Sequence, residues 1–188
     1  SHGHPDHLDE KTFQYLNNSC ILVPDHYGDR IYNYFRKKMN SYNVITLFPN
    51  LIEEWKNTGI INQALKNNLV AINSTNLRDF GIGKYKQVDD TIYGGGAGMV
   101  LKPEPIFQGV NKIKSDNLLD NCPVILMSPQ GKILDQKKAK NLSKFKDIIV
   151  IAGRYEGVDE RIVSNLVSDE ISIGDYILSG GELPTAIF

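Results

Sequence analysis

Short, continuous apolar runs alternate along the chain with stretches whose apolar residues recur every three or four positions. The runs are typical of buried strands, and the stretches between them are typical of amphipathic helices. Because buried strands that alternate with helices form parallel sheets, the pattern predicts an α/β fold, a mostly parallel sheet with helices on both faces. The predicted strands are residues 42–48, VAIN at 70–73, 122–128, 147–153 and 170–178.

Helices are predicted in the segments between these strands. One is expected after Pro49, which closes the first strand, and runs through Leu51, Ile52 and Trp55 to Gly59. Proline in the first turn favours another over residues 103–113. Asp135 is expected to cap a third, whose Ala139, Leu142 and Phe145 would face inward. Further helices are expected through Ile61, Leu65 and Leu69 and over residues 157–167, whereas VDDTIYGGGAGM (88–99) is expected to be a loop.

The loops that follow three of the predicted strands are the first candidates for a ligand site. They are SPQGK (128–132), GRYEG (153–157) and SGGELP (179–184). In parallel sheets, ligands bind beyond the carboxyl ends of the strands. We therefore expect these loops to converge on one site.

Composition predicts one globular domain with a small appendage. The 188 residues are 41% apolar and 23% charged, which is ordinary for a globular protein. Residues 1–38 differ from the rest in being rich in histidine and then aromatic and basic, so we treat them as an N-terminal extension of a domain over 39–188. No membrane-spanning run or secretory signal is visible, and Cys20 and Cys122 form no CxxC, so we expect a cytoplasmic protein with no membrane partner.

Residue types exclude several kinds of catalytic site. No histidine follows His26, and Cys122 is the one cysteine after that point, so the main domain has no Ser-His-Asp, Cys-His or histidine-rich zinc site. The SHGHPDH cluster at the N-terminus has metal-like spacing, but we interpret it as a terminal segment and predict no metal site. Chemistry must therefore use carboxylates, Arg, Lys, Tyr, Ser and backbone groups.

The glycine-rich segments match no phosphate-binding motif. GxxxxGK[ST] is absent, and YGGGAGM places Met99 where GxGxxG needs its last glycine. Backbone groups, small residues and a few acids suit an adenine and a ribose with a nearby cation, as in a nucleoside sulfonium. The formal net charge is −1; the six lysines between Lys132 and Lys146 fit either a solvated helix face or a stripe that contacts phosphates.

Five motifs occur in order along the main domain. They are VITLFP (44–49), VDDTIYGGGAGM (88–99), SPQGKILDQ (128–136), IAGRYEGVDER (151–161) and SIGDYILSGGELP (172–184). With these motifs the chain from 39 to 188 resembles the bacterial tRNA (guanine-N1)-methyltransferases, the TrmD family of the SPOUT (trefoil-knot) superfamily. GRYEGVDER followed by SIGDYILSGGELP is the most specific part of the match.

The resemblance implies properties that the residue pattern alone does not predict. It implies a C-terminal trefoil knot, a rare exception to the rule that chains are unknotted. It implies S-adenosylmethionine as cofactor, with a magnesium ion as a further candidate, and an obligate homodimer with both sites at the interface. The substrate would be the guanosine of tRNA just 3′ of the anticodon, position 37.

Site residues follow from the resemblance by motif. Glu156 would lie near the sulfonium or a magnesium ion, and Asp89 near the target guanine. Arg154 would orient Glu156 or contact RNA, whereas Asp159 to Arg161 would form helix-start and interface pairs. The glycines among the implied cofactor residues could alternatively serve only tight turns. The implied cofactor residues are Leu126, Ser128, Pro129, Gly131, Gly153, Tyr155, Glu156, Ile173, Gly174, Asp175, Tyr176, Ile177, Leu178, Gly180 and Gly181.

The family's proton-accepting aspartate and charge-stabilising arginine lie downstream of LSGGELP, beyond Phe188. We therefore assign no catalytic base and expect a chain truncated before its C-terminal tRNA-binding domain, able to bind the cofactor but with little methylation. An alternative is a non-catalytic knotted dimer that binds S-adenosylmethionine or RNA. A nucleotide-dependent α/β enzyme is a third, disfavoured by the absent phosphate loops.

Overall fold

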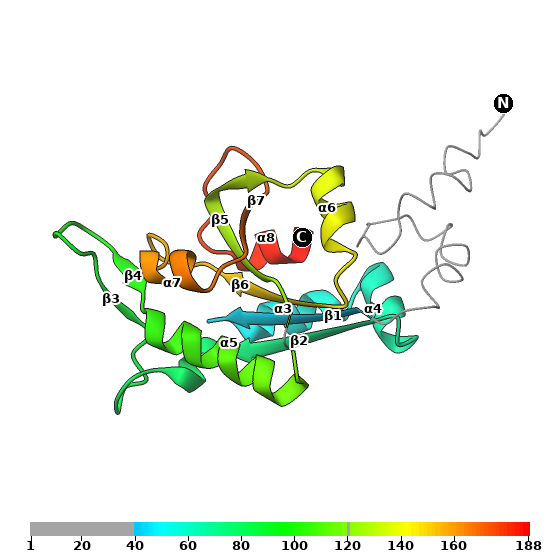
Figure 1. The fold of residues 1–188 in the computed structure, drawn as a ribbon, viewed down its shortest axis with the longest axis horizontal. Coiled ribbons are helices and arrows are strands. Elements are labelled where there is room, and N and C mark those ends of the chain that lie inside the picture. The colour runs from blue at the N-terminus through cyan, green and yellow to red at the C-terminus, as the bar shows by residue number, and fades with distance from the viewer. Residues whose placement is uncertain (1–39, 120) are drawn as a thin grey trace.

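The computed structural model describes residues 40–119 and 121–188; the predicted extension over 1–38 and the SHGHPDH cluster lie outside the described residues. The described chain forms a parallel five-stranded sheet in the order β2-β1-β6-β5-β7 (Figure 1). This confirms the predicted fold class. The strands are β1 (Asn40–Thr46), β2 (Val70–Asn76), β5 (Val124–Ile133), β6 (Asp147–Ala152) and β7 (Asp169–Ser172).

Helices cover both faces of the sheet, because alternate residues of the apolar strands point to opposite sides. Val44 and Val150 face one core cluster with Ile52, whereas Ile45 and Ile151 face the other. The first cluster includes residues of α3 (Pro49–Lys56), α4 (Gly59–Lys66) and α6 (Gln136–Leu142), and the second those of η2 (Leu77–Phe80), α5 (Pro103–Asn117) and α7 (Glu160–Asn165).

The starts of the helices follow from local chemistry. Proline occupies the first turn of α5, as predicted, and Pro49 also begins α3. The Asp135 carboxylate accepts the backbone N–H of Lys138 at 2.6 Å and caps α6, which confirms that prediction. The predicted inward position of Phe145 is wrong, because this residue follows the end of α6 and is 43% exposed.

Residues 88–99 are not only a loop, as predicted, but contain most of a small hairpin. Strand β3 (Asp89–Thr91) pairs antiparallel with β4 (Met99–Leu101), and Asp89 lies opposite Leu101. Each strand is three residues long, and β3 is polar, so the sequence contains no alternating pattern that would predict the hairpin. The hairpin extends from the main sheet at the end where β3 and β4 are labelled in Figure 1.

The strand predicted over 170–178 is also shorter than expected. β7 ends at Ser172, whose hydroxyl accepts the backbone N–H of Gly174 at 3.2 Å and donates to the Gly174 carbonyl at 2.9 Å. This local bonding competes with the strand ladder and turns the chain. The chain then leads through residues 173–181 to a last helix, α8 (Glu182–Ile187).

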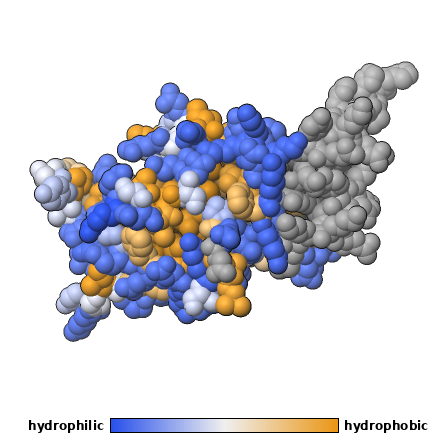
Figure 2. All heavy atoms as spheres, viewed as in Figure 1, coloured by the Kyte–Doolittle hydropathy of each residue, from blue (hydrophilic) through white to orange (hydrophobic). Residues whose placement is uncertain are grey.

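Between residues 40–119 and 121–188, no helix is long and apolar enough to cross a membrane. Hydrophilic residues dominate the outline of the face in Figure 2, and apolar residues gather towards its middle. Large apolar side chains are also exposed on the last segment of the chain, where Ile177 is 85% exposed and Leu183 62%. This segment borders the loops that follow the sheet.

Candidate functional site

Two of the three predicted loops, those that follow β6 and β7, meet beyond the ends of their strands. The backbone N–H of Gly181 donates to the carbonyl of Gly153 at 2.7 Å, which joins the second loop to the third. The segment over 128–132, predicted as the first loop, lies instead within β5, where the pairing with β7 is irregular between Met127 and Lys132. The contact between the second and third loops is therefore confirmed, the first predicted loop is part of a strand, and the cofactor role of these residues stays a prediction.

Three glycines of this cluster are required by packing. A Cβ on Gly181 would lie 2.5 Å from the backbone nitrogen of Gly153, and one on Gly153 would lie 2.8 Å from the Met127 carbonyl oxygen. A Cβ on Gly131 would lie 2.5 Å from the backbone of Glu170 and Ile171. Because protein backbone fills this space, these positions need glycine whether or not a ligand binds.

The remaining predicted cofactor residues form a partly open surface around these contacts. Leu126 is buried in β5, and Ile173 packs against a core cluster. The aromatic ring of Tyr176 lies against Gly174. Ser128 accepts the backbone N–H of Gln130 at 3.2 Å and is half-buried, like Gly180. The exposed members of the predicted set are Pro129, Tyr155, Glu156, Asp175, Tyr176, Ile177 and Leu178.

A polar cluster that sequence analysis missed fastens the third loop to the sheet. Glu182, 4% exposed, accepts a hydrogen bond from the Thr46 hydroxyl at 2.8 Å. Its other carboxylate oxygen lies 3.8 Å from Nε of Arg154, whose guanidinium donates to the Ser179 carbonyl. In the sequence, Glu182 stands out only as an acid that follows two glycines and precedes Leu-Pro. This local pattern does not reveal a hydrogen-bond partner 136 residues away.

Arg154 is held in place by this cluster. Besides Ser179 and Glu182, its guanidinium carbon lies 4.4 Å from the centroid of the Phe48 ring, a cation–π contact. Its side chain is 22% exposed. Both roles predicted for Arg154, orienting Glu156 or contacting RNA, stay predictions.

The second loop is bound to the hairpin as well as to the third loop. The N–H of Glu156 donates to the Met99 carbonyl at 3.0 Å, and the N–H of Leu101 donates to the Gly157 carbonyl at 3.0 Å. A Cβ on Gly98 would lie 2.5 Å from Cγ of Glu156, so the glutamate side chain passes over the hairpin backbone. The hairpin and the loop cluster therefore form one continuous surface.

A hydrogen bond between Asp89 and Tyr155 connects the predicted substrate residues with the predicted cofactor residues. Burial raises the pKa of the Tyr155 phenol, and its hydrogen bond with the Asp89 carboxylate raises it further. Tyr155 has a φ of 59°, an uncommon backbone conformation for a residue with a side chain. The structure thus places a residue predicted to contact guanine beside one predicted to contact the cofactor.

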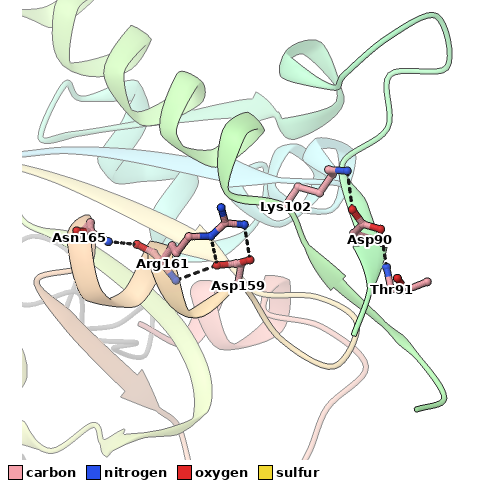
Figure 3. Close-up of polar contacts among 6 residues, drawn as sticks. All are labelled: Asp90, Thr91, Lys102, Asp159, Arg161 and Asn165. Carbon is pink, nitrogen blue, oxygen red and sulfur yellow. Dashed lines mark hydrogen bonds and ion pairs between the residues drawn. The ribbon is translucent and has the colours of Figure 1, made fainter. Parts of the chain in front are cut away.

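Two further ion pairs flank the hairpin (Figure 3). The Lys102 ammonium lies 2.7 Å from Asp90, and this hydrogen bond lowers the pKa of Asp90 and raises that of Lys102. At the start of α7, Asp159 accepts the backbone N–H of Arg161 at 2.9 Å and two guanidinium N–H groups at 2.8 Å. The predicted helix-start role of Asp159 is confirmed, and its interface role stays a prediction.

An apolar cavity of about 40 Å³ lies elsewhere, under α8 and beside α3 and α4. Trp55, Ile61 and Phe188 are among its lining residues, and none of the predicted cofactor residues lines it. Pockets for drug-sized ligands have roughly 300–1,000 Å³, so this cavity is a packing gap and not a nucleoside site. Its lining offers no charged group for a sulfonium.

No group of three or more His, Cys, Asp or Glu side chains that could hold a metal occurs in the part of the chain that the structure describes. Magnesium, which the resemblance offers as a further cofactor beside Glu156, stays a prediction. The arrangement can hold an apolar ring against glycine-rich backbone, and it can present the carboxylates of Asp89 and Glu156 beside it.

Comparison with known proteins supplies the family. A family model described as tRNA (guanine-1)-methyltransferase TrmD matches residues 40–188. A tRNA (guanine-N(1)-)-methyltransferase of Sulfurihydrogenibium sp. (strain YO3AOP1) is 53% identical over 144 residues, 77% of this chain and 56% of that protein. One of Prochlorococcus marinus (strain MIT 9312) is 53% identical over 148 residues, 78% of this chain and 59% of that protein.

A solved structure agrees with these matches. The tRNA (m1G37) methyltransferase from Aquifex aeolicus superposes with a TM-score of 0.72 and 42% sequence identity, covering 80% of this chain and 66% of that one. The present chain spans about three fifths of the length of the curated relatives it matches.

Proposed function

This chain belongs to the TrmD family of tRNA (guanine-1)-methyltransferases, and from that membership we propose that it serves S-adenosylmethionine-dependent methyl transfer to N1 of a tRNA guanosine, the one at position 37. The observation that carries the proposal is the contact between the loop cluster and the hairpin. It brings Asp89, on the predicted RNA side, beside Tyr155, on the predicted cofactor side.

The loop residues fit the cofactor that we propose. Ile173 and Leu178 can enclose an adenine, and the backbone of the three loops offers N–H and C=O groups to its edges. Glu156 is exposed and carries a negative charge for the sulfonium side. When bound, S-adenosylmethionine supplies a methyl group activated by its sulfonium charge. The residues that would hold it are the predicted set of the three loops.

The chain's own residues would position the target base. Methylation at N1 requires loss of the N1 proton and stabilisation of the charge that develops towards O6. Asp89 is proposed to accept hydrogen bonds from the guanine edge and so to hold N1 in line for transfer. We assign no general base among residues 40–188, and no step is assigned to magnesium.

We propose a trefoil knot and a homodimer for the same domain. The chain leaves β7 at one edge of the sheet, crosses the loops after β5 and β6, and packs α8 beside β6 and α3. Such a path supports a threaded C-terminal segment. Exposed apolar side chains on this segment, Ile177 at 85% and Ile187 at 55%, support burial against a second copy. A tRNA substrate would place the protein in the cytoplasm.

Two assays test the proposal. Calorimetric titration with S-adenosylmethionine should show binding, and adenosine diphosphate should show none. Methyl transfer from labelled cofactor should then be measured on tRNA with guanosine at position 37 and on the same tRNA with adenosine there. Transfer confined to the guanosine substrate supports the activity, and absence of cofactor binding by the folded chain would refute the proposal.

The alternative, a non-catalytic knotted dimer, has its own signature in the same experiments. The observation that favours it is the absence of an assigned base among the described residues. It predicts cofactor or RNA binding without methyl transfer to either tRNA. Sedimentation of the chain would show whether the binding species is a dimer.

A further inference from the structure

The turn between η2 and the hairpin, residues 81–87, carries a pattern that the proposed function does not use. Ile82 and Gln87 exchange two backbone hydrogen bonds of 2.8 and 3.0 Å, and Lys86 N–H donates to the Gly83 carbonyl at 3.2 Å. These bonds close a tight turn. Tyr85 projects from its tip and is 88% exposed.

A lysine lies on each side of Tyr85 in the sequence. Lys84 and Lys86 are exposed, and among residues 40–119 and 121–188 Lys84 has no ion-pair partner. Lys86 lies 3.7 Å from Asp79, and both of these side chains are more than 60% exposed, so this pair is weak and water-screened. An exposed ring between two available lysines can stack on a base and contact its phosphates.

The C-terminal end of the turn leads directly to the candidate site. Asp89 follows the turn in β3 and pairs with Leu101, whose N–H donates at 3.0 Å to the carbonyl of Gly157, in the loop that carries Tyr155. Burial, and then the hydrogen bond with the Asp89 carboxylate, raise the pKa of Tyr155, in agreement with this geometry. Asp89 lies four positions after Tyr85, so their Cα atoms are at most about 14 Å apart. This distance covers roughly four nucleotides of a stacked strand.

We propose that the turn over residues 81–87 is an RNA-contacting surface, in which Tyr85 stacks on an unpaired base beside the target guanosine and Lys84 and Lys86 contact the phosphates. The inference rests on the proposed function for its choice of substrate. The exposed Tyr93 at the hairpin tip is a poorer candidate, because residues 92–98 around it carry no charge. In Figures 1 and 2 the turn and the hairpin project from the same end of the molecule.

The test measures binding of a fluorescein-labelled RNA hairpin whose loop contains an unpaired guanosine, by anisotropy on the full chain. Tyr85→Ala should weaken binding by about fivefold to 100-fold, and Tyr85→Phe should retain it. Lys84→Gln should lower the slope of log affinity against log salt by about one. Lys66→Gln is the matched control and should change binding little. Lys66 is exposed at the end of α4, before β2 begins, whereas the turn over 81–87 follows the other end of β2.

The outcomes separate this inference from the proposed function. Calorimetry with S-adenosylmethionine should give the same affinity for Tyr85→Ala as for the parent chain. If Tyr85→Ala binds the RNA hairpin like the parent, or if the parent binds a blunt duplex of the stem equally well, the inference is wrong, although methyl transfer could still be found. A changed sedimentation coefficient for Tyr85→Ala would instead assign the turn to a protein interface and overturn the inference.

Discussion

The loop cluster around Gly153 and the hairpin around Asp89 meet at one edge of the sheet, but they use glycine for different reasons. In the loop cluster, Gly153 and Gly181 are glycines because backbone of another segment occupies the space of a side chain. In the hairpin, Gly95 has a φ of +86° and nothing within 4 Å of where its Cβ would be. One region is limited by space, and the other by backbone conformation.

Their polar groups differ in the same way. The loop cluster buries the Glu182 carboxylate and bonds it to Thr46, far away in the sequence. The hairpin keeps its charges near water, in the pair of Asp90 and Lys102. A closed cluster suits a cofactor held in fixed geometry, whereas an open hairpin suits a large polar substrate that must enter and leave.

The largest expected loss of stability comes from adding one methyl group to the loop cluster. Gly181→Ala places a Cβ 2.5 Å from the Gly153 nitrogen, so the two loops must separate. We expect a destabilisation of about 3 kcal/mol, which lowers the melting temperature by roughly 6–12 °C. Calorimetric binding of S-adenosylmethionine should be lost with it.

Gly95→Ala is the matched control for this substitution. Its new methyl group meets open space, so the cost is the strain of a positive φ, about 1 kcal/mol. Cofactor binding should be unchanged. Equal losses of stability in thermal melts of the two variants would show that the distinction between space and conformation does not hold.

A second effect tests the buried carboxylate of the loop cluster. Thr46→Val keeps the shape of the side chain but removes the hydroxyl that donates to Glu182 and accepts the Phe48 N–H at 2.9 Å. We expect a loss of roughly 2 kcal/mol in the free energy of unfolding by urea, because a buried charged group loses a donor. Thr91→Val, in the exposed hairpin, is the control and should change stability by less than about 0.5 kcal/mol.

The sequence predicts the sheet and its helices well because both depend on local patterns. The apolar runs of β1, β5 and β6 are buried on both faces, so they stand out from their neighbours. The hairpin is missed because β3 and β4 are only three residues long, and because β4 is held in part by hydrogen bonds to the distant loop over 153–157. The end of β7 is missed because the Ser172 hydroxyl competes with the ladder.

The candidate site is predictable only in part. Loops that follow parallel strands must lie at one edge, which is why their convergence is foreseen. The bond between Thr46 and Glu182 spans 136 residues, and no local pattern specifies a partner at that distance. The path of the chain across the loops is a property of topology, which periodicity does not record.

The smallest expected effect concerns Asp159, at the base of the loop that carries Tyr155. Its hydrogen bond with Arg161 lowers the pKa of Asp159 in the folded chain. A lowered folded-state pKa stabilises the fold above the unfolded value, near pH 3.9, and this stabilisation is lost as the pH falls through the folded-state pKa. Asp159→Asn keeps an N-cap but removes the charge, so its stability should vary less with pH below about pH 4 than that of the parent.

Asp159→Ala removes the N-cap as well and should cost about 1 kcal/mol at neutral pH, with the same reduced pH dependence. Urea unfolding of both variants from neutral pH to below pH 4 separates the contribution of the cap from that of the charge. If Asp159→Asn kept the full pH dependence of the parent, the carboxylate at the start of α7 would not be its source. Asp159 would then act only as a cap.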